Sequence, residues 1–194
     1  MSKSRLGVPP AGAAGMAVAM VMVALPARAD TCPPSTTCPT TVTFTVTAVA
    51  GLEITVPNGP VALGSGTPGN QISRQLGAIT VSDQRAALAA TWVASVIAAP
   101  AGFTTGGGTA AETIPAGAAL YWSGPATATT GTGTFVPGQV NAAAAQSLDV
   151  SRTAFGKTTG SGNNSATWNP TVVINIPVQA VIGTYTGTVN HSVA

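Results

Sequence analysis

Apolar and polar residues alternate along four stretches of this chain, residues 41–49, 51–57, 171–178 and 183–193. Threonine occupies many of the polar positions, and Val, Ile, Leu, Phe or Tyr stands between them. A period of two with β-branched residues is typical of strands. The residues predicted to share strand faces are Val42, Phe44 and Val46; Leu52, Ile54 and Val56; Val172, Ile174 and Ile176; and Tyr185, Val189, His191 and Val193.

Turn-forming residues separate these stretches, in PNGP, GSGTPGN, TTGGG, TGTGTFVPG and GKTTGSGNNS. Short strands between such turns predict an all-β fold, which we take to be an antiparallel, Greek-key or immunoglobulin-like β-sandwich with long Gly/Thr-rich loops. Residues 140–148 (VNAAAAQSL) are equally compatible with a short helical turn or a strand. Residues 99–111 are rich in Gly and Thr and are predicted to form a long surface loop.

The first 29 residues have the three parts of a secretory signal peptide. Lys3 and Arg5 form a basic start, residues 11–25 are apolar, and residues 27–29 read Ala-Arg-Ala, the small-x-small pattern of a cleavage site. A membrane anchor is the alternative, but it needs about 20 apolar residues, and this run is shorter. We expect cleavage after Ala29, secretion, and no membrane segment in the mature protein.

Charged residues make up only 6% of the chain. Lys3, Arg5 and Arg28 leave with the signal peptide, so four basic and five acidic side chains remain and the mature net charge is −1. No basic stripe is left that could neutralise several phosphates. We therefore expect no nucleic-acid partner.

The two cysteines, Cys32 and Cys38, lie in CPPSTTC directly after the predicted cleavage site. An even number of cysteines in an exported protein indicates a disulfide, and so small a ring contributes about 2 kcal/mol in the loop-closure model. The alternative is a redox or metal pair, although the only histidine, His191, is far away in sequence. We expect residues 30–40 to be a disulfide-bonded leader and residues 41–194 to be one domain.

Two segments far apart in the chain carry motifs that occur together in one known family. The first is VSDQR at residues 81–85, followed after a spacer by TWVASV at residues 91–96. The second starts with WNPTVVINIP at residue 168 and ends with GTYTGTVNHSV at residue 193. Together they resemble the WxL domain of Gram-positive surface proteins. Trp92-Val93-Ala94 and His191-Ser192-Val193 stand at the two Trp-x-Leu positions, so both motifs are altered here.

The resemblance implies a β-sandwich and a non-catalytic role at the cell surface. Members of that family associate non-covalently with peptidoglycan, and some assemble with other surface proteins. The implied function is non-covalent association with the cell wall, through peptidoglycan or a wall polymer. The alternative is an assembly subunit that binds another exported protein, or itself, by strand addition, because edge strands this poor in charge are weakly protected. Whether His191 keeps the contact of the family's tryptophan stays open.

Asp83 and Arg85 are opposite charges two residues apart at a predicted strand end, so their side chains share a face. One interpretation is structural: an ion pair that fixes the turn leading to Trp92, which lies in an apolar strand and is predicted to be core. The other is a polar contact for sugar or peptide. Surface ion pairs are common and weak, which favours the structural interpretation. Tyr185, in the GTYTGTVNHSV motif, is assigned a structural role together with Asp83, Arg85 and Trp92.

Trp122 and Trp168 lie beside predicted loops, Trp122 before Ser-Gly-Pro and Trp168 before Asn-Pro. Each is equally compatible with a place in the core and with a stacking surface for a sugar ring or a protein partner. With Tyr121 and His191 they form the set of candidate binding residues. The expected partner is a cell-wall glycan or another surface protein.

No combination of residues in the sequence indicates catalysis. His191 has no Gly-x-Ser-x-Gly motif to accompany it, and the mature acids are scattered rather than paired as in glycosidases. No calcium-loop pattern occurs. We expect no enzyme activity, no metal and no cofactor.

Overall fold

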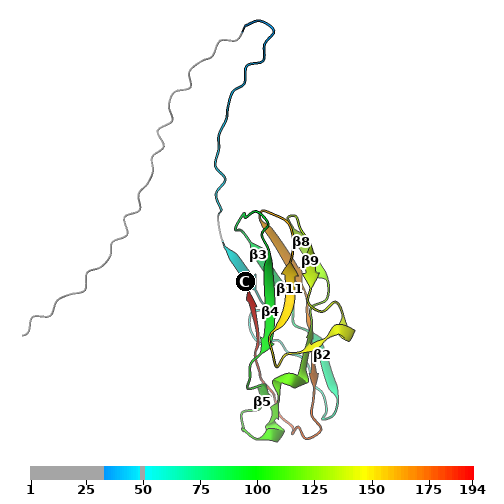
Figure 1. Cartoon of the computed structure of the whole chain (residues 1–194). Helices are drawn as coiled ribbons and strands as arrows, with labels where there is room; N and C mark the ends of the chain where they lie inside the picture. Colours follow the sequence, from blue (N-terminus) through cyan, green and yellow to red (C-terminus); the bar gives the residue numbers. More distant parts are fainter. Residues whose placement is uncertain (1–32, 49–50) are drawn as a thin grey trace, which may run out of the picture. The chain divides into compact units, whose positions relative to one another are not determined.

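The computed structural model describes residues 33–48 and 51–194 (Figure 1). The chain divides into two units, one ending at Phe44 and the other spanning Thr45–Ala194. Within the first unit, the Thr36 hydroxyl and amide both donate to the Pro33 carbonyl, at 2.6 and 3.3 Å, and close a turn. The predicted signal peptide and Cys32 lie outside the described residues, so the cleavage and the Cys32–Cys38 disulfide stay predictions.

Residues 41–48 do not form the predicted strand. The side chains of Val42, Phe44 and Val46 are 78%, 86% and 76% exposed. An alternating segment becomes a strand only where a neighbour pairs with its backbone and covers its apolar face. Residues 41–48 therefore have the alternating sequence of a strand but pair with no other strand of the described chain.

The second unit is built almost entirely of short strands. They are β1 Leu52–Thr55, β2 Gln71–Gln75, β3 Ile79–Asp83, β4 Trp92–Ala98, β5 Phe103–Thr104, β6 Thr113–Ile114, β7 Ala119–Trp122, β8 Ala126–Thr130, β9 Phe135–Pro137, β10 Gln146–Ser147, β11 Arg152–Lys157, β12 Asn164–Trp168, β13 Thr171–Asn175 and β14 Val189–Val193. Three single-turn 3-10 helices, η1 Ala110–Glu112, η2 Ala116–Ala118 and η3 Ala142–Ala144, complete the regular elements of the described chain.

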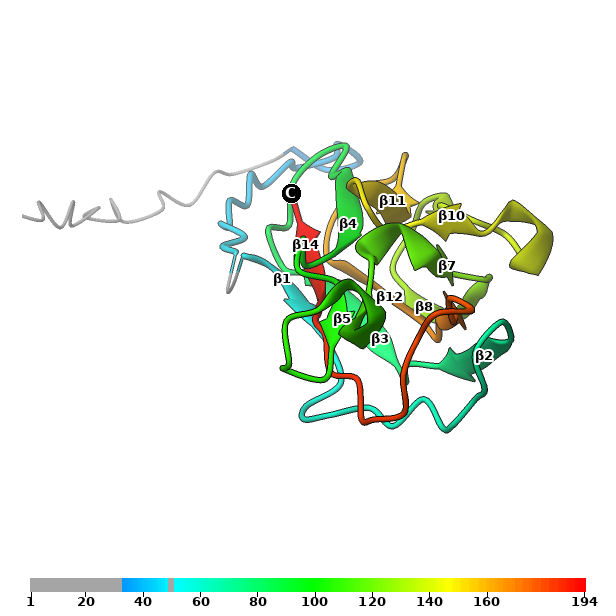
Figure 2. The same ribbon diagram turned by 90° about the horizontal axis from the view of Figure 1, so that it is seen from below.

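These strands form antiparallel sheets, which confirms the predicted all-β, sandwich-like fold. Three sheets have four strands each, in the orders β1-β3-β12-β8, β10-β7-β13-β2 and β14-β4-β11-β9, and β5 pairs with β6 in a fourth. The chain passes from the first sheet to the second directly, because β13 begins three residues after β12 ends. Figure 2 shows β4 and β11 in one layer, with β3 and β8 in another.

The core lies between the β3–β12 pair and the β4–β11 pair. Alternate residues of β3, β4 and β12 are buried, as the period of two requires. Phe155 from β11 stacks on Trp168 from β12, with ring centroids 4.9 Å apart and planes 19° apart. Such aromatic pairs add about 0.5–1.5 kcal/mol beyond the burial of their area.

One local prediction is corrected, and another that was left open is decided, by pairing between distant residues. Residues 99–111 are not wholly a loop, because Phe103 of β5 pairs with Ile114 of β6 and η1 follows within the same stretch. Residues 140–148 contain both of the elements that were considered. A 3-10 turn, η3, is capped by the Asn141 side chain, which accepts from the amide of Ala144, and β10 then pairs with β7.

Candidate functional site

The Asp83–Arg85 pair forms a bidentate ion pair at the end of β3. Arg85 Nε donates to Asp83 Oδ1 at 2.8 Å and Arg85 Nη2 donates to Asp83 Oδ2 at 2.9 Å. The same Nη2 donates to the Thr91 carbonyl at 2.8 Å, immediately before Trp92. The Asp83 carboxylate is fully buried, and its hydrogen bonds with Arg85 lower its pKa to about 2.

Asn164 extends this pair into a buried polar network. Its side-chain amide donates to Asp83 Oδ2 at 3.3 Å, and its carbonyl oxygen accepts from Trp92 Nε1 at 2.9 Å. The network therefore connects β3, β12 and β4. These contacts support the structural interpretation of Asp83 and Arg85, since each carboxylate oxygen is already bonded within the protein. Trp92 is 2% exposed and belongs to the core, as predicted.

Trp168 and Tyr121 are core residues, which corrects their place among the candidate binding residues. Both side chains have no exposed surface. Trp168 Nε1 donates to the Tyr121 hydroxyl at 3.1 Å, and burial raises the pKa of that hydroxyl. A ring without exposed surface cannot stack on a sugar while the domain keeps this conformation. For Trp168 the sequence left a core position and a binding surface equally possible, and the structure shows the core position, because the residue faces inward at the end of β12.

Trp122 is the tryptophan that keeps exposed surface. It ends β7 and is half-buried. A Cβ atom added at Gly124 would lie 3.3 Å from the Trp122 ring, so the chain turns back closely over one edge of it. Of the three tryptophans, this one alone stays a candidate for direct contact with a partner.

His191 and Tyr185 line the same apolar groove, described below, but differ in their contacts. The Tyr185 hydroxyl lies 2.9 Å from the Val181 carbonyl and 3.0 Å from that of Ala111, and it donates to one of them at a time. His191, in β14, packs its ring 5.8 Å from that of Tyr121. Its Nε2 is buried without a hydrogen-bond partner in the described structure, and burial lowers its pKa to about 4. The imidazole is therefore neutral near pH 7.

Lys157 is a buried cation that the sequence did not single out. Its side chain is 1% exposed, and its ammonium donates to the carbonyls of Ala90, at 2.5 Å, and Gly160, at 3.1 Å. Among the described residues, no carboxylate lies within ion-pair distance of it. A buried ammonium needs such bonds, so it fixes the loop after β11 against the loop before β4.

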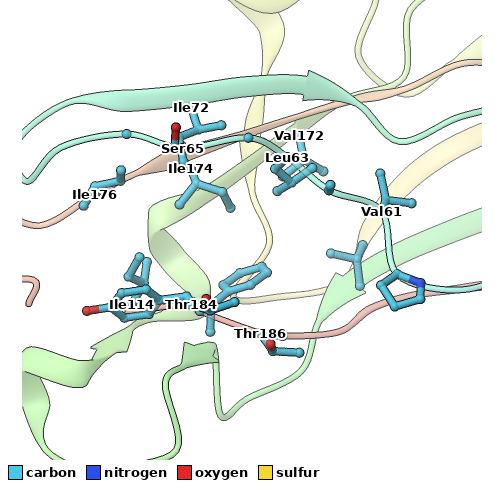
Figure 3. A pocket seen from close by; sticks show the side chains of 18 of the residues that line it. Val61, Leu63, Ser65, Ile72, Ile114, Val172, Ile174, Ile176, Thr184 and Thr186 are labelled. Atoms are coloured by element: carbon cyan, nitrogen blue, oxygen red, sulfur yellow. The ribbon is translucent and has the colours of Figure 1, made fainter. Parts of the chain in front are cut away.

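An apolar groove of about 1090 Å³ opens in the second unit. Figure 3 shows Val61 and Leu63 on one side of it and Thr184 and Thr186 on the other. Its remaining surface comes from strand residues that include Ile72, Ile174 and Ile114. None of its lining residues is Asp, Glu, Lys or Arg. This volume is slightly larger than the range of about 300–1,000 Å³ typical of ligand sites.

Residues 58–66 form one wall of the groove and follow β1; we call them the 58–66 segment. This segment makes no backbone hydrogen bond to any described residue. Its sequence, NGPVALGSG, contains one proline and three glycines. An added Cβ at Gly66 would lie 2.7 Å from Ile176 and 2.9 Å from Ile72, so the segment passes close over β2 and the end of β13. Its backbone carbonyls and its amides, apart from Pro60, therefore have no backbone partner in the described chain.

The opposite wall, which we call the 184–188 segment, precedes β14 and is paired along one edge only. Thr186 exchanges two backbone hydrogen bonds with Thr104, at 2.9 and 3.0 Å, and the Thr188 carbonyl accepts from Ala99 at 2.8 Å. Backbone groups of successive residues in an extended chain point to opposite edges. The backbone amides and carbonyls of Tyr185 and Gly187 therefore point to the other edge of the segment. These groups have no backbone partner in the described chain.

Gly187 is required by the close approach of this wall to β5. A Cβ atom at this position would lie 2.4 Å from the Phe103 ring and 2.7 Å from the Gly102 carbonyl. Distances below 3.0 Å are not tolerated by real Cβ atoms. Sequence reasoning missed the groove because its walls are more than a hundred residues apart.

Comparison with protein-family models, with curated proteins and with solved structures gave no match. The resemblance to WxL domains therefore rests on the quoted motifs. Within residues 33–48 and 51–194, no three His, Cys, Asp or Glu side chains lie close enough together to hold a metal ion. None of the helices in that part of the chain has the length and apolar character needed to cross a membrane.

Proposed function

We propose that this chain is an exported, non-catalytic surface module that binds an extended apolar segment of another polypeptide by strand addition. The observation that carries the proposal is the groove, both of whose walls have backbone groups without a backbone partner in the described chain. In strand addition, backbone hydrogen bonds give affinity, and pockets for alternate side chains give specificity. The groove supplies open backbone groups along the 58–66 and 184–188 segments, and an apolar surface between them.

The absence of charge in the groove favours an uncharged, apolar occupant. A charged side chain entering it would have to lose water without meeting a counter-charge. His191, the one imidazole in the lining, is neutral near pH 7 because burial lowers its pKa to about 4. The polar side chains of the lining are mostly Ser and Thr hydroxyls and are outnumbered by apolar residues, so a peptide with alternating apolar residues is a better fit than a glycan.

Binding of a designed peptide tests the proposal. An eight-residue peptide of alternating Thr and Val, labelled with fluorescein, is compared with a peptide of the same composition whose valines are grouped at one end. We expect the alternating peptide to bind dilute mature chain at least about tenfold more tightly, as measured by fluorescence anisotropy. Equal affinity of the two peptides would contradict the proposal.

A matched pair of variants locates the binding. Val61→Asp places a charge on the groove wall, where the side chain is 38% exposed, and Val150→Asp places one in a turn outside the groove, at 48% exposure. We expect Val61→Asp to weaken the peptide at least about tenfold and Val150→Asp to leave it unchanged. The same loss in both variants would show that the contact lies elsewhere.

Association with the cell wall is a second proposal, supported by the motif resemblance and by the exposed surface of Trp122. An indole that is only partly buried beside a tight turn can contact a sugar ring. Mature chain mixed with purified cell-wall sacculi should co-sediment, and Trp122→Ala should reduce the bound fraction. Wild-type chain that stays in the supernatant would remove this proposal and leave the groove proposal intact.

A further inference from the structure

We propose that the occupant of the groove is residues 41–48 of a second copy of this chain, so that copies join head to tail. We call residues 41–48 the donor segment. The inference rests on the proposed strand addition and names its partner. It predicts that the mature protein forms linear assemblies. In each assembly, every copy inserts its donor segment into the groove of one neighbour and accepts the donor segment of another.

The donor segment has the pattern that the groove requires. Thr41-Val-Thr-Phe-Thr-Val-Thr-Ala48 places Val42, Phe44 and Val46 on one face and four threonines on the other. These three apolar side chains are 76–86% exposed, so the described chain leaves this apolar face uncovered. Eight residues in a strand span about 26 Å. The face can therefore enter a groove whose walls are five and nine residues long.

The donor segment and the groove also agree in charge. Residues 41–48 contain no ionisable side chain, and the groove has no Asp, Glu, Lys or Arg in its lining. Joining them desolvates no charge. Their backbone groups complement one another as well, because residues 41–48 are unpaired and both groove walls have free amides and carbonyls.

The segment's own tether argues against insertion into the groove of the same copy. The groove lining begins at Val56, after the end of β1, whereas the donor segment joins the other end of β1, at Leu52. If the chain reversed at residues 49–51, Val46 would lie beside Ile54 in β1, and only Phe44 and Val42 would come near the groove, at its Val56 end.

Crowding beside β1 strengthens this argument. Pairs of Cα atoms in β1 and β14 lie within 8 Å of each other. A strand inserted between two others needs them about 9.6 Å apart, twice the spacing of neighbouring strands. The donor segment of a second copy meets neither obstacle, because it is not tethered to this copy's β1 and need not pass between β1 and β14.

The contact is heterologous, since one surface is the donor segment and the other is the groove. A heterologous contact that does not close into a ring produces an open linear assembly. The number of copies in that assembly depends on protein concentration. Both properties distinguish this contact from a symmetric dimer, whose size is fixed at two copies.

Light scattering coupled to size exclusion tests the inference on the mature chain. We expect wild-type assemblies to grow with concentration up to about 100 μM. Phe44→Asp removes the donor face, and Val61→Asp blocks the groove; each variant alone should be monomeric. Thr43→Asp, on the opposite face of the donor segment, is the matched control and should assemble to within about threefold of the wild type.

Mixing the two defective variants gives the most specific outcome. Phe44→Asp keeps an intact groove and Val61→Asp keeps an intact donor segment, so the mixture should form a one-to-one dimer that cannot grow. Circular dichroism melting of each variant shows that it is folded. A monomeric wild type, a mixture without dimer, or a Thr43→Asp variant as defective as Phe44→Asp would overturn the inference.

The peptide experiment separates the two proposals. If the wild type is monomeric while the alternating peptide still binds and Val61→Asp abolishes that binding, the groove accepts strands but not its own donor segment, and only this inference fails. If the peptide does not bind either, the proposed function fails with it.

Discussion

The tryptophans show how far the environment of a single residue decides its role. Trp168 has no exposed surface, stacks on Phe155 and donates a hydrogen bond to Tyr121. Trp122 is half-buried at the end of β7. The two residues have the same side chain and similar sequence surroundings, since each precedes a turn. The contrast comes only from the direction in which each side chain leaves its strand.

Replacement of Trp168 should therefore cost more stability than replacement of Trp122. We expect Trp168→Ala to lower the free energy of unfolding by about 3–5 kcal/mol, the range for aromatic residues truncated in cores. Trp122→Ala should cost less than Trp168→Ala, because part of the Trp122 residue stays in contact with water whereas Trp168 has no exposed surface. Urea unfolding followed by circular dichroism measures both, and equal losses would contradict the assignment of Trp168 to the core.

His191 should make the stability of the protein depend on pH. Burial lowers its pKa from 6.5 to about 4, so below pH 6.5 the unfolded chain takes up a proton that the folded chain refuses. Stability is full above pH 6.5 and is lost as the pH falls towards 4, by up to about 3 kcal/mol. His191→Gln should abolish this loss, as measured by urea unfolding at pH 7.5 and 4.5. An unchanged difference between the two pH values would contradict the burial of the imidazole.

Asp83 contributes in a separate and lower pH window. Its folded pKa of about 2 lies below its ordinary value of 3.8, so its contribution is present above pH 4 and is lost as the pH falls through 2. His191→Gln should leave the loss of stability below pH 4, which comes from Asp83, unchanged. The two windows keep the contributions of the imidazole and the carboxylate apart.

At the scale of elements, the alternating pattern predicted strands correctly where a neighbouring strand pairs with the segment. β1, β13 and β14 lie within predicted stretches, and Trp92 lies in a strand as expected. Residues 41–48 have the clearest alternation of all and form no strand. The pattern specifies an apolar face, but it does not specify the surface that covers the face.

The same reasoning explains which parts of the candidate sites could be predicted. Asp83 and Arg85 are two residues apart on one strand end, so their contact follows from local geometry. Asn164, which bonds to Asp83, is 81 residues away in sequence. The β5–β6 pairing and the groove also depend on distant segments. Composition alone therefore predicted a loop at residues 99–111 and gave no indication of a groove.

For the whole molecule, the account joins three features that are separate in sequence. A neutral, threonine-rich segment has an uncovered apolar face, a groove of matching character lies in the folded unit, and the groove walls have unpaired backbone groups. Uncovered strand edges with little charge favour association. In this account, unpaired edges of low charge associate through a defined groove. The groove selects its partner by the alternation of apolar and polar side chains in the donor segment.

Hydrogen–deuterium exchange of the groove walls tests this account most directly. Amides of the 58–66 and 184–188 segments are followed by mass spectrometry in concentrated wild-type protein and in Phe44→Asp. We predict slow exchange in both segments of the wild type and fast exchange in the variant, because strand addition would give those amides hydrogen-bond partners. Equal exchange in the two proteins would contradict the claim that the groove accepts the donor segment.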